Sequence, residues 1–287
     1  MSPIIRSATL DDKEAIIDLL QGHMEASWSR ERWVRVLSTR WVGPDKPIEI
    51  GQVVLDDGRL VGFIGCVTAD RVIMEHPVRT GSISSFYLLK PYRGCGLGKA
   101  MMLATTSNPE VTYTVTGASP NTEKMMLASG FSVLDRDRYI WRATGTANTS
   151  AVSIHENVWT IRDRLPAHQR RLLEDHEDIN IRVIGIDGGG TLSLAFFSVK
   201  VKDEGVTYWS VLHLSDPEHF AKYVEALTDH LLEGNAVLAC DRRYLGKDID
   251  AQLEVLKAPH YFKSRTLAPR MIDHLYSEIV LLDLKMA

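Results

Sequence analysis

The sequence predicts an α/β fold arranged in two domains, and three observations lead to that prediction. The chain has 287 residues, a length that suits two compact domains of ordinary size. Hydrophobic residues make up 45% and charged residues 24%, which is the composition of a folded globular protein. Segments with the alternating pattern of strands are interspersed with segments that have the apolar spacing of helices.

The N-terminal part begins with a short strand at 4–6 and a helix for which Thr9 is the expected N-cap. A second helix is expected at about 29–39, before the Gly/Pro-rich break at 43–47. Strand-like runs at 51–55 and 60–68 are joined by Asp56-Asp57-Gly58-Arg59, and Asp-Gly favours a tight hairpin turn. Another strand is expected at 82–89.

A glycine-rich run follows that strand, and the pattern continues beyond it. We expect a helix from 99 to 106, a strand at 111–116 and a short helix at 122–128 that Gly130 terminates. Residues 131–134 and 138–142 have the pattern of a last hairpin. The polar stretch 143–150 is typical of a linker.

The second half shows a similar alternation of elements. Strands are expected near 181–187, 192–201, 206–214, 236–240 and 274–284. A helix is expected from Pro217 to Leu232, with Asp216 as its N-cap. The domain prediction is therefore 1–145, a linker with a connecting helix at 146–180, and a smaller α/β domain at 181–287.

The glycine-rich run Tyr92-Arg93-Gly94-Cys95-Gly96-Leu97-Gly98-Lys99-Ala100 lies between a strand and a helix. Glycines allow the backbone to turn tightly and to approach a ligand closely. The first N–H groups of the helix then converge on one point, where hydrogen bonding and the helix dipole both favour an anion. Arg93 and Lys99 add positive charge. The run therefore predicts a phosphate-binding loop.

Two common phosphate-binding motifs do not fit this run. A dinucleotide-binding Gly-x-Gly-x-x-Gly pattern would require glycine where Lys99 or Met101 stands. A Walker loop would end in Gly-Lys-Ser/Thr, whereas Ala100 follows Lys99.

The order of elements and the loop together resemble the GNAT (GCN5-related N-acetyltransferase) superfamily over about residues 3–145. The family pattern is Gln/Arg-x-x-Gly-x-Gly/Ala, which Arg93, Gly96 and Gly98 match. Asn121, before the short helix that leads to Gly130-Phe131, is similar to a second family feature. The resemblance implies a central mixed, mostly antiparallel sheet flanked by helices.

The resemblance also implies the activity and the binding residues. It implies an acyltransferase (an N-acetyltransferase) that moves an acetyl or other short acyl group from acetyl-coenzyme A to an amine by direct attack, without a metal. The loop would hold the pyrophosphate, and the preceding strand would pair with the pantetheine arm. The cofactor-binding residues that it implies are Phe86, Tyr87, Leu88, Leu89, Arg93, Gly94, Cys95, Gly96, Leu97, Gly98, Lys99, Ala100 and Asn121.

The sequence departs from the family where protons are transferred. Many relatives have a tyrosine acid four residues before the Gly-Phe, but Met126 lies near that position. A glutamate on the central strand is a frequent base, and Ile83-Ser84-Ser85-Phe86-Tyr87 contains none. Tyr87 and His76 are the catalytic candidates that we favour equally. Four other candidates in this half are less favoured: Ser84, Glu75, His23 and Glu25.

The second half contains Asp187-Gly188-Gly189-Gly190-Thr191, which is similar to the phosphate loop of sugar kinases. Only about a hundred residues follow it, too few for a two-lobed kinase body. We therefore interpret this run as a glycine-rich hairpin turn. The pattern of elements after 180 instead resembles the later half of a GNAT fold without its loop. Such a degenerate copy could complete a sheet, shape the acceptor pocket or form a homodimer.

Charge and cysteine content limit the partners. The net charge is −4, which gives no electrostatic basis for binding nucleic acid or an anionic membrane. The three scattered cysteines and the lack of a signal-like N-terminus are typical of a cytoplasmic protein. The leading hypothesis is a transferase that acts on a small-molecule amine. A protein N-acetyltransferase and an inactive acyl-coenzyme A sensor remain as alternatives.

Overall fold

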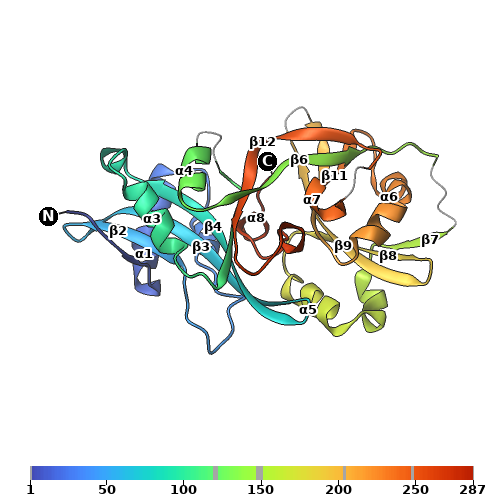
Figure 1. Cartoon of the computed structure of the whole chain (residues 1–287), viewed down its shortest axis with the longest axis horizontal. Coiled ribbons are helices and arrows are strands. Elements are labelled where there is room, and N and C mark those ends of the chain that lie inside the picture. The colour runs from blue at the N-terminus through green and yellow to red at the C-terminus, as the bar shows by residue number, and fades with distance from the viewer. Residues whose placement is uncertain (1, 119–121, 147–150, 203–204, 247–248, 287) are drawn as a thin grey trace. The chain divides into compact units, whose positions relative to one another are not determined.

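The computed structural model of the chain describes residues 2–286 except 119–121, 147–150, 203–204 and 247–248. The chain divides into two compact units (Figure 1). Unit 1 comprises Met1–Leu134, Ala258–Ala268 and Tyr276–Leu284, and unit 2 comprises Asp135–Lys257, Pro269–Leu275 and Lys285–Ala287. Strands β6 (Ser132–Trp141) and β12 (Gln252–Lys263) pass from one unit into the other, so neither unit is one continuous stretch of sequence.

Unit 1 is built on a sheet with strand order β1-β2-β3-β4-β5-β12, in which only β4 and β5 pair in parallel. In chain order its elements are β1 (Ile4–Ser7), η1 (Leu10–Asp12), α1 (Lys13–His23), α2 (Arg30–Arg35), β2 (Gly51–Asp56), β3 (Arg59–Ile73), β4 (His76–Leu88), η2 (Lys90–Tyr92), α3 (Leu97–Thr105), β5 (Val111–Val115), α4 (Glu123–Ala128), the end of β12, and α8 (Glu278–Leu281).

Local interactions explain where the first elements begin. Asp12 accepts a hydrogen bond from the N–H of Thr9 at 2.9 Å and two from Arg6 at 2.7 Å, so that the predicted cap of the first helix forms. The Arg6 guanidinium holds the pKa of Asp12 at about 2. The predicted β2–β3 hairpin also forms, with Asp57 and Gly58 at φ values of 47° and 78°.

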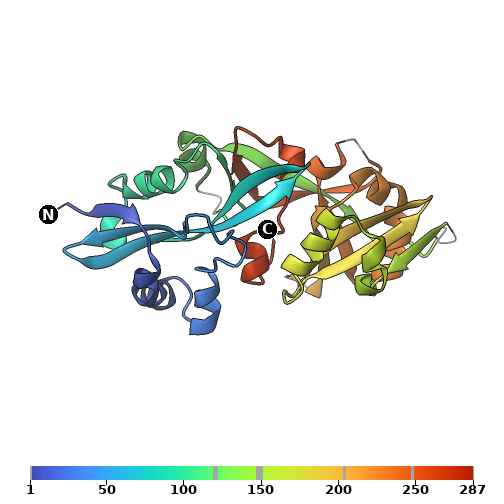
Figure 2. The same ribbon diagram turned by 90° about the horizontal axis from the view of Figure 1, so that it is seen from below.

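Helices cover both faces of the unit 1 sheet (Figure 2). Helices α1 and α2 pack on one face through a cluster that includes Ile16, Leu20, Trp33 and Phe63. Helices α3 and α4 pack on the other face through a cluster that includes Met101, Met102, Met126, Ile64 and Tyr113. Successive residues of β3, such as Phe63 and Ile64, therefore enter different cores, as the two-residue period of a strand requires.

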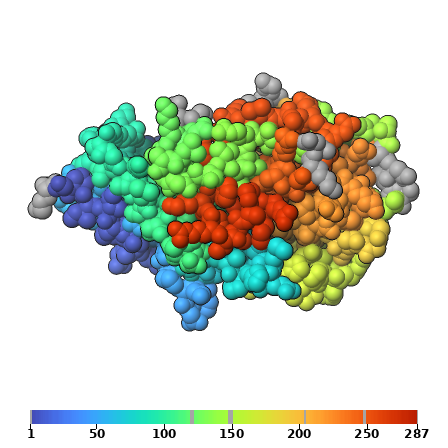
Figure 3. Space-filling view, in the orientation of Figure 1, coloured from blue at the N-terminus to red at the C-terminus, as the bar shows by residue number. Residues whose placement is uncertain are grey.

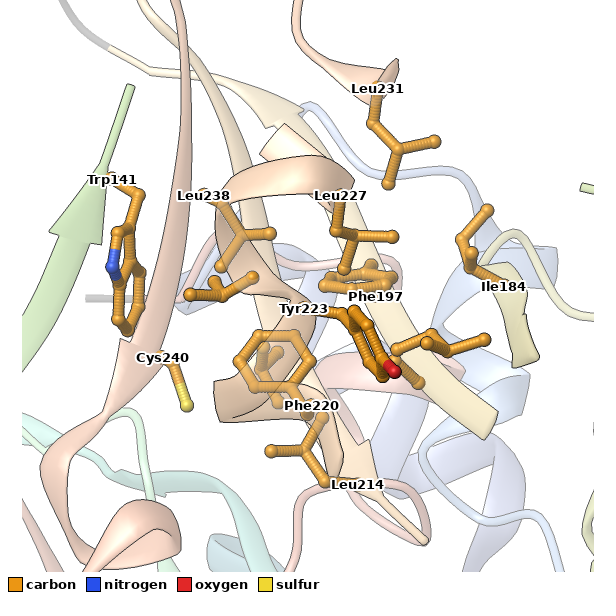
Figure 4. Packing of buried hydrophobic residues seen from close by; sticks show 14 of the residues in the cluster. Trp141, Ile184, Phe197, Leu214, Phe220, Tyr223, Leu227, Leu231, Leu238 and Cys240 are labelled. Atoms are coloured by element: carbon orange, nitrogen blue, oxygen red, sulfur yellow. The ribbon is translucent and has the colours of Figure 1, made fainter. Parts of the chain in front are cut away.

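Unit 2 contains the remaining strands of the 12-stranded order, β6-β11-β10-β9-β8-β7, among which only β10 and β11 pair in parallel. Its elements are β6, β7 (Val152–His155), η4 (Val158–Arg164), α5 (Ala167–Asp175), β8 (Arg182–Gly188), β9 (Thr191–Val201), β10 (Thr207–Leu214), α6 (Pro217–Leu231), β11 (Ala236–Asp241), α7 (Arg242–Leu245), the start of β12, and η6 (Pro269–Met271). Figure 4 shows its core, in which Phe220, Tyr223 and Leu227 of α6 pack over the sheet.

The two units share one topology. In each, three consecutive antiparallel strands are followed by a helix and then by a strand parallel to the third. In each, the next strand of the sheet comes from a distant part of the chain, because β12 pairs with β5 and β6 pairs with β11. This topology agrees with the expectation of a second, GNAT-like half, and the mostly antiparallel α/β fold class is confirmed.

Two predicted elements are wrong. Residues 132–141 form one strand, β6, and not a hairpin, and charged residues within it have partners: Asp135 accepts from Arg243, and Arg138 donates to Glu254. Residues 274–284 contain α8 and no strand. All four α8 residues are buried, and a short, fully buried apolar run has no periodicity that separates a helix from a strand.

The Asp187–Thr191 run is a hairpin turn, as predicted. Gly188 pairs with Thr191 across β8 and β9, and Gly189 and Gly190 have φ values of 60° and 82°. Asp187 accepts from Arg164 at 2.8 Å on the side of this hairpin. In the part of the chain that the structure describes, no helix has both the length and the apolar character that crossing a membrane would require.

Candidate functional site

A bulge interrupts the regular pairing of β4 with β3 near the end of β4. Tyr87 pairs with Phe63 and Ser84 with Gly65, so Ser85 and Phe86 together lie opposite the single residue Ile64. Ser85 has a φ of 45°, a conformation that non-glycine residues seldom adopt. A bulge of this kind bends the strand and changes the direction of its main-chain groups.

Strand β5 accompanies β4 for only a short distance. Their parallel pairing runs from Arg79 with Val111 to Ser82 with Thr114. Beyond Ser82, β4 continues through the bulge to Leu88. In the described structure these later residues of β4 do not pair with β5. The main-chain groups on this edge of β4 are therefore available to an extended ligand.

The glycine-rich loop leads from β4 into α3, which Figure 3 shows at the surface in teal. Gly94 and Gly96 have φ values of 81° and 88°, and a Cβ added to either would meet nothing within 4 Å. They are glycines because of the backbone conformation, and the space above them is open. Gly96 is the N-cap of α3 and no side chain caps this end. The first N–H groups of α3 are thus free to bind an anion.

Side chains of the loop fix its shape. Arg93 donates from Nε to the Leu88 carbonyl at 2.7 Å, and its guanidinium lies 5.0 Å from the centre of the Tyr87 ring. The Tyr92 hydroxyl donates to Asp56 at 2.6 Å. The exposed Cys95 thiol donates to the Tyr92 carbonyl at 3.1 Å. Part of the Arg93 guanidinium therefore positions the loop, and Lys99 remains exposed at the start of α3.

The equivalent position in unit 2 is closed to anions. The Asp216 side chain caps α6 and accepts from the His219 N–H at 2.9 Å, and Pro217 removes one donor from the first turn. A carboxylate occupies the place that a phosphate would need. Of these two related helix starts, only that of α3 lacks a side-chain cap.

The structure separates the two catalytic candidates. Tyr87 lies beside the loop, where its ring stacks on His23 at a centroid distance of 6.0 Å and an interplanar angle of 9°. His76 is exposed at the opposite end of β4, where it pairs with Ile73 beside the hairpin tip. Eleven positions of strand at about 3.3 Å each place it about 36 Å from Tyr87. The structure does not bring His76 to the loop.

The sequence analysis also singled out Met126 and Asn121. Met126 is a buried member of the core between the sheet and α3 and α4, where it has a packing role. Asn121 lies outside the described residues.

Sequence reasoning missed one buried carboxyl group. Glu278, the first residue of α8, is 3% exposed. It accepts hydrogen bonds from Ser82 of β4 and, at 2.9 Å, from Thr116 directly after β5. Burial raises the pKa of the Glu278 carboxyl, while the two hydroxyl donors oppose that rise. The signal in the sequence was an acidic residue at the start of the apolar run 279–282.

A second group of buried charges lies in unit 2. Arg243 donates to both Asp135 and Asp241, and His274 lies 2.8 Å from Asp241 and 3.0 Å from Arg243. We call these four residues the Arg243 cluster. Carboxylates and a histidine are common metal ligands. Here the guanidinium already supplies the positive charge that would compensate them, so the cluster reads as an internal ion network.

The chain is similar to known proteins in one segment of its sequence and in its fold. Residues 13–106 match the model of the acetyltransferase (GNAT) family, a segment that includes the bulge and the loop. No curated protein sequence matches the chain. Among solved structures, a GCN5-related N-acetyltransferase from Anabaena variabilis is similar with a TM-score of 0.58 and 10% identity, covering 91% of this chain and 72% of that one.

Two further structures extend the likeness. Eis1 from Mycobacterium abscessus is similar with a TM-score of 0.53 and 12% identity, covering 92% of this chain and 73% of the other. A GCN5-related N-acetyltransferase from Kribbella flavida gives a TM-score of 0.55 and 15% identity, with coverage of 91% and 70%. At these identities the structures show the fold. Through residues 13–106 the chain matches the GNAT acetyltransferase family, whose members are acyl-coenzyme A-dependent acyltransferases.

Proposed function

We propose that unit 1 transfers an acetyl, or another short acyl, group from coenzyme A to a primary amine of a small molecule by direct attack. The observation that carries this proposal is the uncapped start of α3, which follows a bulged strand with an unpaired edge. Acetyl-coenzyme A carries a pyrophosphate, an amide-containing arm and a thioester, and these three parts suit the three features in turn.

The residues present fit this co-substrate. The N–H groups from about Cys95 to Ala100 hold the pyrophosphate, with Lys99 adding charge. The main chain of Phe86 to Leu89 pairs with the arm as an added strand would. A Cβ at Gly98 would make an ordinary van der Waals contact with the Phe86 ring at 3.4 Å, so Gly98 packs next to the strand that would bind the arm. An amide near Tyr87 donates to the thioester oxygen as negative charge develops there.

A small cationic or neutral amine is the proposed acceptor. The net charge of −4 gives no general attraction for nucleic acid, and the proposal requires no metal. Tyr87 lies close enough to the loop to contact the acceptor, and its contacts with His23 and Arg93 fix its ring. His76 has no part in the proposed reaction because of its distance from the loop.

The test is turnover by the full chain. Acetyl-coenzyme A should be consumed, with release of free thiol, in the presence of at least one member of a panel of amino sugars, amino acids, polyamines and peptides. Release with a peptide amine but with no small amine would favour a protein acetyltransferase. Tight binding of acetyl-coenzyme A by calorimetry, with no turnover on any amine, would favour an inactive sensor and refute the proposal.

A further inference from the structure

The buried carboxyl of Glu278 lies at the point where β4 and β5 separate. Ser82, which binds one of its oxygens, is the last β4 residue that pairs with β5. Thr116, which binds the other, comes directly after the end of β5. Glu278 thus occupies the fork between the two strands, on the side from which the unpaired edge of β4 leads to the glycine-rich loop.

The segment that carries Glu278 is anchored firmly to unit 1. The Leu282 carbonyl accepts from Arg32 at 2.6 Å, and the Leu282 side chain is buried in the α1–α2 core. The Tyr276 ring packs edge-on to Trp41 at 5.1 Å and lies under the Arg71 guanidinium at 4.2 Å. A carboxyl held in this way loses little further freedom when it takes part in a reaction.

A second serine hydroxyl lies on the β4 face that carries Ser82. Ser84 lies two residues beyond Ser82, on the same face of β4 and next to the bulge. Its side chain is 5% exposed, and its oxygen is buried without a hydrogen-bond partner in the described structure. Leaving a buried hydroxyl unpaired is unfavourable by about 1–3 kcal/mol, so a polar ligand or a water molecule would be stabilised at this place.

The chemistry of acyl transfer needs a proton acceptor at this place. An alkylammonium has a pKa of about 10.4 and cannot attack a thioester until it loses a proton. Strand β4 supplies no carboxylate between Thr80 and Leu88. Glu278 brings one to this strand from the C-terminal segment.

We propose that Glu278 is the catalytic base that deprotonates the acceptor amine, with the Ser84 hydroxyl as a second contact that orients its nitrogen. This inference rests on the proposed transfer to an amine. The Glu278 carboxylate takes one proton from the ammonium. The nitrogen then forms a bond to the thioester carbon, and the carbon–sulfur bond breaks. The second proton of the nitrogen goes to the leaving thiolate, and Glu278 releases its proton to solvent.

The electrostatic environment suits this role. Burial raises the pKa of Glu278 and so makes it a stronger base than an ordinary glutamate. The titratable groups that face it are His260 of β12, whose influence opposes the rise, and Cys66 of β3. The pKa of the Cys66 thiol is raised to about 12 by its burial, so it stays neutral while Glu278 titrates.

The test is the pH dependence of kcat/KM for the amine that the panel identifies. In the wild-type chain, kcat/KM should fall on the acid side as Glu278 becomes protonated. Glu278→Gln should lower kcat about 10²–10⁴-fold. It should also remove the part of the acid limb that Glu278 sets. The fraction of neutral amine then sets the profile, so that kcat/KM rises tenfold per pH unit up to the pKa of the amine. Glu278→Asp should restore the limb.

Two kinds of variant separate catalysis from structure. Leu282→Ala loosens the same segment but keeps the carboxyl, so it should lower the melting temperature and leave the acid limb in place. Thr116→Val removes a hydrogen bond that favours the charged form, so the limb should move to higher pH. This last result tests the idea even if Glu278→Gln fails to fold.

The outcomes are distinct. A Glu278→Gln enzyme that keeps its rate within a few-fold, with the acid limb unmoved, would overturn the role of Glu278 and leave the proposed function intact. A wild-type chain that binds acetyl-coenzyme A and acetylates no amine would overturn both. Calorimetry on Glu278→Gln should show unchanged coenzyme A affinity, since the phosphate loop is intact.

Discussion

Replacement of Gly96 by glutamate tests the anion site with a matched control inside the same chain. Gly96 in the loop and Gly58 in the β2–β3 turn have φ values of 88° and 78°, and a Cβ at either position meets nothing within 4 Å. A non-glycine residue in this left-handed region destabilises the fold by about 1–2 kcal/mol. Gly96→Glu and Gly58→Glu should therefore lower the free energy of unfolding by similar amounts.

Only Gly96→Glu places a carboxylate at the start of α3. A unit charge about 4 Å from a phosphate, at an effective dielectric constant of about 20, is repelled by about 4 kcal/mol. Since about 1.4 kcal/mol corresponds to a tenfold change, coenzyme A should bind about 10³-fold more weakly. Calorimetry with coenzyme A measures this affinity, and denaturant unfolding measures the stability of both variants.

A third variant separates charge from size. Gly96→Gln has nearly the same shape as Gly96→Glu and no charge, so it should weaken coenzyme A binding much less. The reasoning about the helix start would be refuted if Gly96→Glu bound coenzyme A as tightly as Gly58→Glu did. If the glutamate and glutamine variants lost the same affinity for coenzyme A, the cause would be steric exclusion and not charge.

Three further changes have defined outcomes. Met126→Leu should leave kcat within a few-fold and stability within about 1.5 kcal/mol, because Met126 packs in a core and a true acid would contribute about 10²–10⁴-fold; steady-state rates and unfolding curves measure both. Arg243→Met should destabilise the fold by about 3–5 kcal/mol, because it leaves the carboxylates of the Arg243 cluster buried without their counter-charge. An unchanged melting temperature would contradict that account. Asp12→Asn should lower stability at pH 5 and lose this effect as the pH falls toward 2, since a depressed pKa stabilises the fold above about pH 3.8 and not below the folded value of about 2. A constant difference in unfolding free energy from pH 5 to pH 2 would rule out Asp12 as its source.

The conformation of the glycine-rich loop could be predicted because its determinants are contiguous. The strand, the two left-handed glycines and the helix start all lie within residues 82–105. Such a unit follows from local rules for turns and helix starts. The β2–β3 hairpin and the Asp216 cap were predictable for the same reason.

The base could not be predicted because its position depends on distant parts of the chain. Glu278 and Ser82 are 196 positions apart in the sequence, and no periodicity in either segment links them. The same holds for β12, which a sequence pattern did not mark and which pairs with β5 through Tyr261 and Val115. The bulge at Ser85 was also hidden, since a serine gives no sign that its φ is 45°.

The exchange of β6 and β12 between the units has a consequence for synthesis of the protein. Strand β5 leaves the ribosome early, but its partner in β12 is made about 150 residues later. At about 5–20 residues per second, the edge of β5 waits for roughly 7–30 s, while the strands β7 to β11 of unit 2 are made. An unpaired edge is a site of mispairing during that interval. Unit 1 begins first and is completed only when residues 258–284 have been made, because its sheet and its buried carboxyl both depend on this late part of the chain.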